Sequence, residues 1–294
     1  MTYLNIGQSL KFMTAGLLTA AALFMTGKPL WAGEDALRVV AVGGSVTEIV
    51  YALGEEDRLV ARDTTSVFPE EAQDLPDVGY IRALSPEGVL SVDPDLVLML
   101  DGSGPQEAVD VLKKTGLPIA DIPNSFTPEG IVEKVRAVGE ALGVPDKAAA
   151  LIVAMEAGLD AAARDANAGS PEIRVLFVLS TAGGRIMASG SGTAAHGILQ
   201  LAGATNAVAA FSGYKQLSDE ALLSAAPDVV LMMDREGDHA ASADELFSHP
   251  ALSQTPAGKN NRLIKMDGQY LLGFGPRTAD AIRDLAAELK AFRS

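Results

Sequence analysis

The side chains that most often carry out chemistry are few in this chain, and they lack the spacing that catalytic or metal motifs require. Its three histidines, His196, His239 and His249, form no His-x-x-x-His pair, so a zinc hydrolase site is not expected. GGSVTE lacks the Gly-x-Ser-x-Gly pattern of a nucleophile elbow, and SGSGT lacks the lysine of a phosphate-binding loop. Cysteine is absent, which excludes disulfides and thiolate metal sites. These missing motifs argue against an enzyme.

Two stretches of the chain are near-copies of each other. Residues 84–101 read LSPEGVLSVDPDLVLMLD and residues 217–234 read LSDEALLSAAPDVVLMMD, with eleven of the eighteen aligned positions identical. In each copy a short helix precedes an apolar run, which is typical of a strand buried in a parallel sheet. Strands and helices alternate around both copies, so the sequence predicts an α/β fold with two similar lobes and mostly parallel sheets.

Polar, glycine-rich segments follow the predicted strands. Ligands of parallel sheets bind at the carboxyl ends of the strands, so we expect these segments to line a cleft between the lobes. The segments are GGSVT (43–47), DTTSVFP (63–69), DGSGP (101–105), PNSFTP (123–128), STAGG (180–184), MDREGDH (233–239) and GQYLLGFGPR (268–277).

One long helix is the only evident connector between the lobes. Residues 144–168 are rich in Ala, Leu, Met and Glu and contain no internal proline after Pro145, a composition that favours helix. The expected organisation is therefore an N-terminal lobe (37–143), a backbone helix (144–168) and a C-terminal lobe (172–294).

The first 32 residues are expected to be a secretory signal peptide. Lys11 precedes sixteen uncharged residues, and the segment ends on the small residue Ala32. A membrane anchor is the alternative, but a spanning helix needs about 20 apolar residues. Removing Lys11 and Lys28 changes the net charge from −15 to about −17, which argues against nucleic acid as a partner. With no cysteine for a lipid anchor, we expect the mature chain in a bacterial periplasm.

Residues 38–98 and 271–282, which include the motifs DTTSVFP and LLGFGPRTADAI, resemble the haem-binding periplasmic subunit of bacterial ABC haem importers. The resemblance extends from Leu37 to Phe292 and places the chain in a wider class that also binds ferric siderophores and cobalamin. It implies a helical-backbone binding protein, with two α/β lobes joined by one long helix and little closure on binding. It also implies haem b as transported ligand rather than catalytic cofactor.

The chain departs from that family at the iron ligand. Members usually carry Tyr in DTTSxYP, whose phenolate ligates the haem iron, but this position is Phe68, which has no lone pair for iron. The alternatives, in order of preference, are His239, His196 and Tyr270. His249, in FSHPAL, is expected in a surface turn instead.

The expected haem pocket combines cations for the propionates with apolar surfaces for the macrocycle. Arg82 and Arg235 are the candidate cations, because the planar fork of an arginine binds carboxylates bidentately. A salt bridge with a nearby Asp or Glu is the alternative role for these two arginines. Tyr80 and Tyr214 stand in GYIRALS and GYKQLS, two more related segments, so a structural role is expected for them rather than iron ligation. The predicted pocket residues are Phe68, Tyr80, Arg82, Arg235 and Phe274, with Tyr270 as a further stacking candidate.

The repeat supplies the expected contacts with a permease. In the wider class, one acidic residue on each lobe docks to arginines of the permease dimer. By resemblance, Glu87 and Glu220 stand at the matching positions of this chain. Ser85 can cap a helix with Pro86 at its first position, which places Glu87 in the first turn of that helix. Acidic residues are common in the first turn because they interact favourably with the helix dipole, and this is the alternative explanation for both glutamates.

The resemblance, together with these residues, implies the periplasmic substrate-binding subunit of an ABC importer that captures haem. The expected partners are haem, an inner-membrane permease dimer with its ATPase subunit and, upstream, an outer-membrane haem receptor system; the chain itself is expected to be a monomer. The same scaffold with a ferric siderophore, cobalamin or another tetrapyrrole is the first alternative. A periplasmic enzyme is the distant one.

Overall fold

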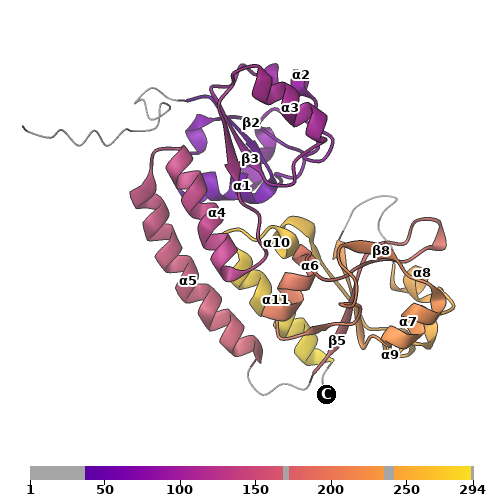
Figure 1. Cartoon of the computed structure of the whole chain (residues 1–294). Coiled ribbons are helices and arrows are strands. Elements are labelled where there is room, and N and C mark those ends of the chain that lie inside the picture. The colour runs from indigo at the N-terminus through magenta and orange to yellow at the C-terminus, as the bar shows by residue number, and fades with distance from the viewer. Residues whose placement is uncertain (1–36, 168–171, 235–241, 293–294) are drawn as a thin grey trace, which may run out of the picture.

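The computed structural model describes residues 37–167, 172–234 and 242–292, which form two α/β lobes beside a group of longer helices (Figure 1). The predicted signal peptide, Arg235 and His239 lie outside these ranges. Within them, no helix has both the length and the apolar character needed to cross a bilayer.

The N-terminal lobe is built on a four-stranded parallel sheet in the order β2-β1-β3-β4. All five residues of β3 are buried, as the apolar run LVLML predicts. The strands and helices of this lobe are β1 (Val39–Val42), α1 (Gly44–Ala52), β2 (Leu59–Arg62), α2 (Pro86–Leu90), β3 (Leu96–Leu100), α3 (Gln106–Lys114) and β4 (Ile119–Ile122), with short 3-10 turns η1 (Glu56–Arg58) and η2 (Glu70–Asp74).

Two helices, α4 (Pro128–Ala141) and α5 (Pro145–Asn167), lead from this lobe to the next. The 23-residue α5 lies within the range in which the sequence predicts one long helix. It passes along one side of the molecule, beside α4 and α11 (Thr278–Ala291), as Figure 1 shows. The connection between the lobes is therefore a packed group of helices rather than α5 alone.

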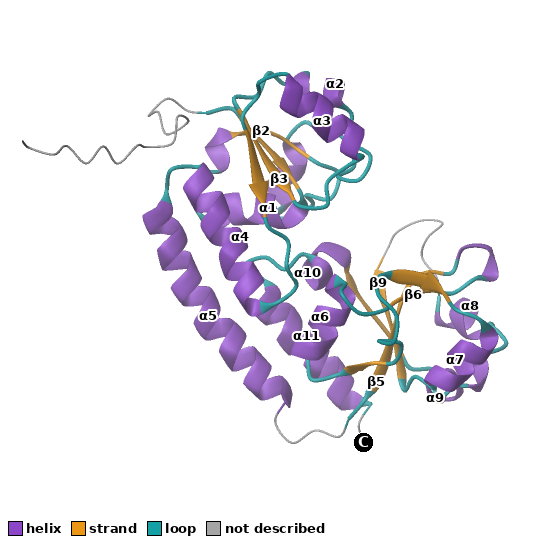
Figure 2. Cartoon of the chain, viewed as in Figure 1, coloured by secondary structure: helices purple, strands orange, loops and turns teal. Residues whose placement is uncertain are grey.

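The C-terminal lobe contains a sheet in the order β10-β9-β5-β6-β8, in which β7 also pairs with β5. β10, β9, β5 and β7 run parallel, but β6 and β8 are antiparallel to their neighbours. In Figure 2 helices flank this sheet as they flank the first. Besides α11, the elements are β5 (Arg174–Ser180), η3 (Ala182–Gly184), β6 (Met187–Ser189), α6 (Ala194–Leu201), β7 (Thr205–Asn206), β8 (Tyr214–Gln216), α7 (Asp219–Ala225), β9 (Val229–Asp234), α8 (Ala243–Phe247), η5 (Leu252–Gln254), α9 (Pro256–Lys259), β10 (Leu263–Asp267) and α10 (Gly268–Leu272).

The hydrophobic core is continuous from one lobe to the other. Alternate residues of each strand face opposite sides of the sheet, so Val40 and Val42 of β1 belong to an outer cluster, whereas Val39 and Ala41 belong to the central one. This central cluster contains residues of β1, β3, α1, α4, α5, β5, β9, α6 and α11. Apolar burial thus joins the two sheets through the helices between them.

Helix starts agree with the sequence in most places. Ser85 and Thr127 cap α2 and α4 through their side-chain oxygens, each with proline at the first helical position, as the sequence predicts for Ser85 and Pro86. Ser45 is buried inside α1. Gly43 stands at the cap position of α1 with a φ of 113°, a conformation that favours glycine.

Candidate functional site

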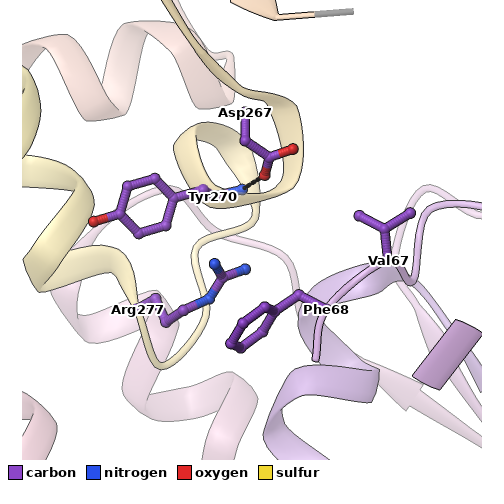
Figure 3. A pocket seen from close by; sticks show the side chains of 5 residues that line it. All are labelled: Val67, Phe68, Asp267, Tyr270 and Arg277. Carbon is purple, nitrogen blue, oxygen red and sulfur yellow. Dashed lines mark hydrogen bonds between the residues drawn. The ribbon is translucent and has the colours of Figure 1, made fainter. Parts of the chain in front are cut away.

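An open pocket of about 370 Å³ is lined by residues of both lobes, next to the carboxyl ends of β2 and β10. Val67 and Phe68 come from the loop after β2, and Asp267, Tyr270 and Arg277 come from the C-terminal segment (Figure 3). Two of the predicted loops, 63–69 and 268–277, thus supply four of the five lining residues. The fifth, Asp267, directly precedes the second loop.

The loop that carries Phe68 is fixed by Asp63, a buried carboxylate just after β2. Its oxygens accept hydrogen bonds from the Gly43 amide (3.0 Å), from the Thr65 amide and hydroxyl (3.1 and 2.7 Å) and from the Ser66 hydroxyl (2.8 Å). Ser66 also shares a 2.7 Å hydrogen bond with Thr47 of α1. Because a buried carboxylate with several donors is strongly held, the motif DTTS positions the Phe68 loop against the first helix.

Arg277 stands between two aromatic rings. Its guanidinium carbon is 3.5 Å from the centroid of the Phe68 ring and 5.1 Å from that of the Tyr270 ring. Figure 3 shows the guanidinium between the two rings. Nη2 also lies 3.0 Å from a carboxylate oxygen of the buried Glu48 in α1, and the Arg277 amide donates to the other oxygen at 3.1 Å. The arginine side chain remains 25% exposed and lines the pocket, so a ligand carboxylate can reach it.

Tyr270 presents its ring to the pocket but not a free phenolate. Its hydroxyl donates a 2.8 Å hydrogen bond to Asp284 of α11. Burial, this hydrogen bond and the nearby charges of Asp284 and Asp280 raise the pKa of the Tyr270 phenol well above its usual value, and the charge of Arg277 opposes the shift only partly. A raised pKa disfavours the phenolate form that would ligate iron.

Gln269 ties α10 to the N-terminal lobe. Its side-chain oxygen accepts a 2.9 Å hydrogen bond from the Val67 amide, and its side-chain nitrogen donates to the Gly44 carbonyl at 2.9 Å. The backbones approach so closely here that a Cβ at Gly44 would lie 2.5 Å from the Thr65 carbonyl oxygen. The Gln269 side chain therefore joins the two segments that line the pocket.

Lys134 of α4 is fully buried at the same junction. Its amine lies within 3.1–3.3 Å of four oxygens, those of the Ser45 hydroxyl, the Asn124 amide and the Gly273 and Phe274 carbonyls. Burial lowers the pKa of this amine to about 7, and the negative charge of Glu48 opposes that shift. Lys134 thus joins the loop before α11 to the N-terminal lobe.

Tyr80 and Arg82 do not line this pocket; both are exposed between β2 and α2. They lie near the other lobe nonetheless. Burial raises the pKa of the Tyr214 phenol on β8, the positive charge of Arg82 opposes this shift, and Tyr80 adds to it. The related tyrosines of GYIRALS and GYKQLS therefore come within electrostatic range of each other, one from each lobe.

His196 is not among the pocket-lining residues. It is the third residue of α6, and its Nδ1 lies 3.3 Å from the side-chain nitrogen of Asn206. Because an amide nitrogen only donates, Nδ1 accepts and the proton of a neutral ring sits on Nε2. His249, in a turn after α8, accepts at Nδ1 from the Ala251 amide. Across the described ranges, no three His, Cys, Asp or Glu side chains gather as a metal site.

Phe274 belongs to the core and not to the pocket lining, contrary to the expectation that its ring faces a ligand. It is 1% exposed and packs edge-on against Phe126, with a distance of 5.3 Å between ring centroids. A Cβ on Gly197 of α6 would lie 3.0 Å from the ring, which shows how closely α6 covers it. The ring therefore packs between α6 and the loop before α4.

Glu87 and Glu220 occupy the second positions of α2 and α7, and both are exposed. Hydrogen bonds from its own backbone and from Ser85 lower the pKa of the Glu87 carboxyl, so it is charged at neutral pH. Neither glutamate forms an ion pair within the described chain, and both charges are open to a partner.

Sequence reasoning missed four residues that build this site: Asp63, Glu48, Lys134 and Arg277. Asp63 and Arg277 belong to the motifs DTTS and GFGPR, and a charged residue inside a predicted ligand loop could have indicated Arg277. Glu48 and Lys134 lie inside helices with no distinguishing spacing, and only the packing of α1 against α4 brings them to the junction.

Comparison with known proteins identifies one family. The model for the periplasmic binding protein family matches residues 39–270. The solved structure of the periplasmic haem-binding protein BhuT in complex with two haems is 38% identical, covers 88% of this chain and 99% of its own, and superposes with a TM-score of 0.82. A Bacillus subtilis ABC transporter substrate-binding lipoprotein is 27% identical over 87% of this chain and 81% of its own length. The vitamin B12-binding protein of Vibrio parahaemolyticus is 25% identical over 89% and 92%.

Proposed function

Because the chain belongs to the periplasmic binding protein family, we propose that it is the substrate-binding subunit of an ABC importer and that its cargo is haem. The observation that carries the proposal is the pocket between the lobes, in which the Arg277 cation stands beside the face of Phe68. A haem presents an apolar plane and two carboxylates, and this wall offers an aromatic surface and a cation. The 38% identity with a haem-binding protein supports the same cargo.

Iron ligation is the feature in which this chain would differ from the family pattern. Phe68 has no ligand atom, the Tyr270 phenol is engaged by Asp284, and His196 accepts a hydrogen bond at Nδ1. We therefore propose His239 as the axial ligand, since it follows β9 on the sequence segment MDREGDH. It lies outside the described residues, and its assignment rests on the sequence.

The propionates require cations at the edge of the macrocycle. Arg277 is the first candidate, because it lines the pocket, although Glu48 already neutralises part of its charge. Arg82 is exposed near the opposite lobe and is the second. Arg235 is a third candidate from the sequence, in the same undescribed segment as His239.

Delivery of the cargo to the membrane would use one exposed glutamate on each lobe. We propose that Glu87 and Glu220 meet arginines of an inner-membrane permease dimer, while a separate ATPase subunit hydrolyses ATP. The chain would carry out no reaction itself, act in the periplasm after removal of residues 1–32, and work as a monomer.

Cobalamin is the second candidate cargo, because a vitamin B12-binding protein aligns with nearly the whole chain. A corrinoid brings its own metal and axial base, so a pocket without a protein ligand would suit it. Measuring which of the two cargoes, haem or cobalamin, binds tightly therefore distinguishes the two proposals.

The test is titration of the mature protein with hemin and, separately, with cyanocobalamin, followed by absorption and resonance Raman spectra. A saturable Soret shift with an imidazole signature that disappears in His239→Ala, but persists in His249→Ala, would support haem and this ligand. Tight cobalamin binding without a Soret shift would replace haem as the cargo. Binding of neither would remove both cargoes.

A further inference from the structure

Two leucines at equivalent positions of the repeat are exposed. Leu90 of α2 and Leu223 of α7 align in the copies 84–101 and 217–234, and these residues are 38% and 43% exposed. The preceding residues, Val89 and Leu222, are fully buried. The two short helices therefore present the same face to solvent, and each leaves a leucine uncovered.

Each exposed leucine stands three residues after an exposed glutamate, Glu87 or Glu220. Residues three apart lie on the same side of a helix, so the carboxylate and the leucine form one small surface, here called the Glu-Leu pair. Equivalent serines, Ser85 and Ser218, cap both helices and fix the pairs in the same local geometry. The molecule thus carries two copies of one surface, one on each lobe.

Neither leucine contributes to a hydrophobic cluster of the described residues. In Figure 1 both helices lie on the side of the molecule away from α5, one on each lobe. A single exposed leucine needs no explanation. Two at matched positions, each beside a matched unpaired acid, fit a partner that presents the same contact twice.

We propose that the Glu-Leu pairs are composite docking points, in which Leu90 and Leu223 enter apolar hollows on the two subunits of a two-fold permease. This proposal rests on the function proposed above and adds an apolar contact to the charged one. Each hollow lies beside the cation that meets the neighbouring glutamate. The leucines supply contact area that salt does not screen, whereas the glutamates guide approach and orientation.

The experiment measures binding of the cargo-loaded mature protein to the cognate permease–ATPase complex in lipid nanodiscs, at low and high salt. The variants are Leu90→Ser, Leu223→Ser and the double variant. Val153→Ser is the matched control, because Val153 is an apolar residue of α5 that is 69% exposed on a different face. Hemin binding and melting temperature verify that each variant is folded.

We expect each leucine variant to bind about tenfold more weakly at both salt concentrations, since about 25 cal/mol is lost for each Å² of apolar surface left in contact with water. Glu87→Gln should weaken binding at low salt and much less at high salt. The Val153→Ser protein should bind like the wild type.

Wild-type affinity in both leucine variants would overturn this proposal while leaving the importer function intact. Failure of the wild-type protein itself to bind the complex would overturn the importer function and the docking proposal together. A further outcome is that the wild-type protein self-associates in sedimentation experiments, whereas the serine variants do not self-associate and still bind the complex. This outcome would assign the leucines to a contact with a second copy of this chain instead.

Discussion

The guanidinium of Arg277 lies directly against the face of Phe68, at the position where the resemblance of the DTTSVFP motif leads us to expect a tyrosine. A phenol at this site would stand beside a cation. Positive charge favours the phenolate form and lowers the pKa of a phenol. Position 68 therefore has a cation beside it but no oxygen on which that cation could act.

Phe68→Tyr should restore a phenolate ligand. We expect the hemin complex of this variant to gain a phenolate-to-iron charge-transfer band and the matching resonance Raman modes, with affinity raised about tenfold by the added bond. Phe68→Leu is the control and should gain neither. An unchanged spectrum in Phe68→Tyr would show that iron does not approach this position.

Tyr270→Phe should leave the spectrum of bound haem unchanged, because the phenol is engaged by Asp284 and its raised pKa keeps it protonated. Loss of that partly exposed hydrogen bond should lower the free energy of unfolding by about 1 kcal/mol. Urea denaturation and the Soret band measure the two effects. A spectral change comparable to that of His239→Ala would make Tyr270 the ligand after all.

Glu48→Gln should destabilise the protein by about 2–3 kcal/mol. The substitution removes a buried partner of Arg277, whose own partial exposure keeps the loss below that of a fully buried pair. Asp280→Asn removes an exposed partner of Arg283 and serves as the control, with little change expected. Equal denaturation midpoints for the two variants would contradict a role for Glu48 in joining the lobes.

Lys134 should make stability depend on pH. Burial lowers the pKa of its amine from 10.5 to about 7 in the folded protein, so the unfolded chain binds more protons between these values. The contribution of Lys134 to the free energy of unfolding should therefore rise from about pH 7 towards pH 10 and stay constant below pH 7.

The measurement is urea denaturation at several pH values with Lys134→Met and, as control, Lys147→Met, whose amine is half-exposed. The difference between wild type and Lys134→Met should grow with pH across this window, whereas the Lys147→Met difference should not. A parallel offset at every pH for Lys134→Met would mean that the amine keeps its ordinary pKa.

The sequence predicted the parts of the fold that depend on local pattern. LVLML and its copy are buried parallel strands, and Ser85 and Pro86 begin α2. The antiparallel strands β6 and β8 were not predicted, because three-residue strands among Gly and Ser carry little periodicity. Phe274 was placed in the pocket instead of the core, because an aromatic residue in a glycine-rich loop gives no indication of whether its ring faces the core or a ligand.

For the functional site as well, the sequence predicted what depends on local pattern and missed what depends on contacts between distant segments. Two of the seven strand-end loops that were expected to line a cleft, 63–69 and 268–277, do line the pocket, since parallel sheets place such loops at one edge. The cations and acids that build it depend on contacts between distant helices. Lys134, for example, sits in the ordinary helical sequence EKVRAV, and only four oxygens from three other segments reveal its role.

The continuous core has a consequence for the kinetics of cargo exchange. Separating the lobes would expose apolar surface and break the contacts of Gln269, Lys134 and Glu48 at the same time. The pocket is already open, so cargo can enter without a preceding conformational step. The observed association rate should then rise linearly with cargo concentration without saturating, and the residence time should depend on the pocket contacts alone.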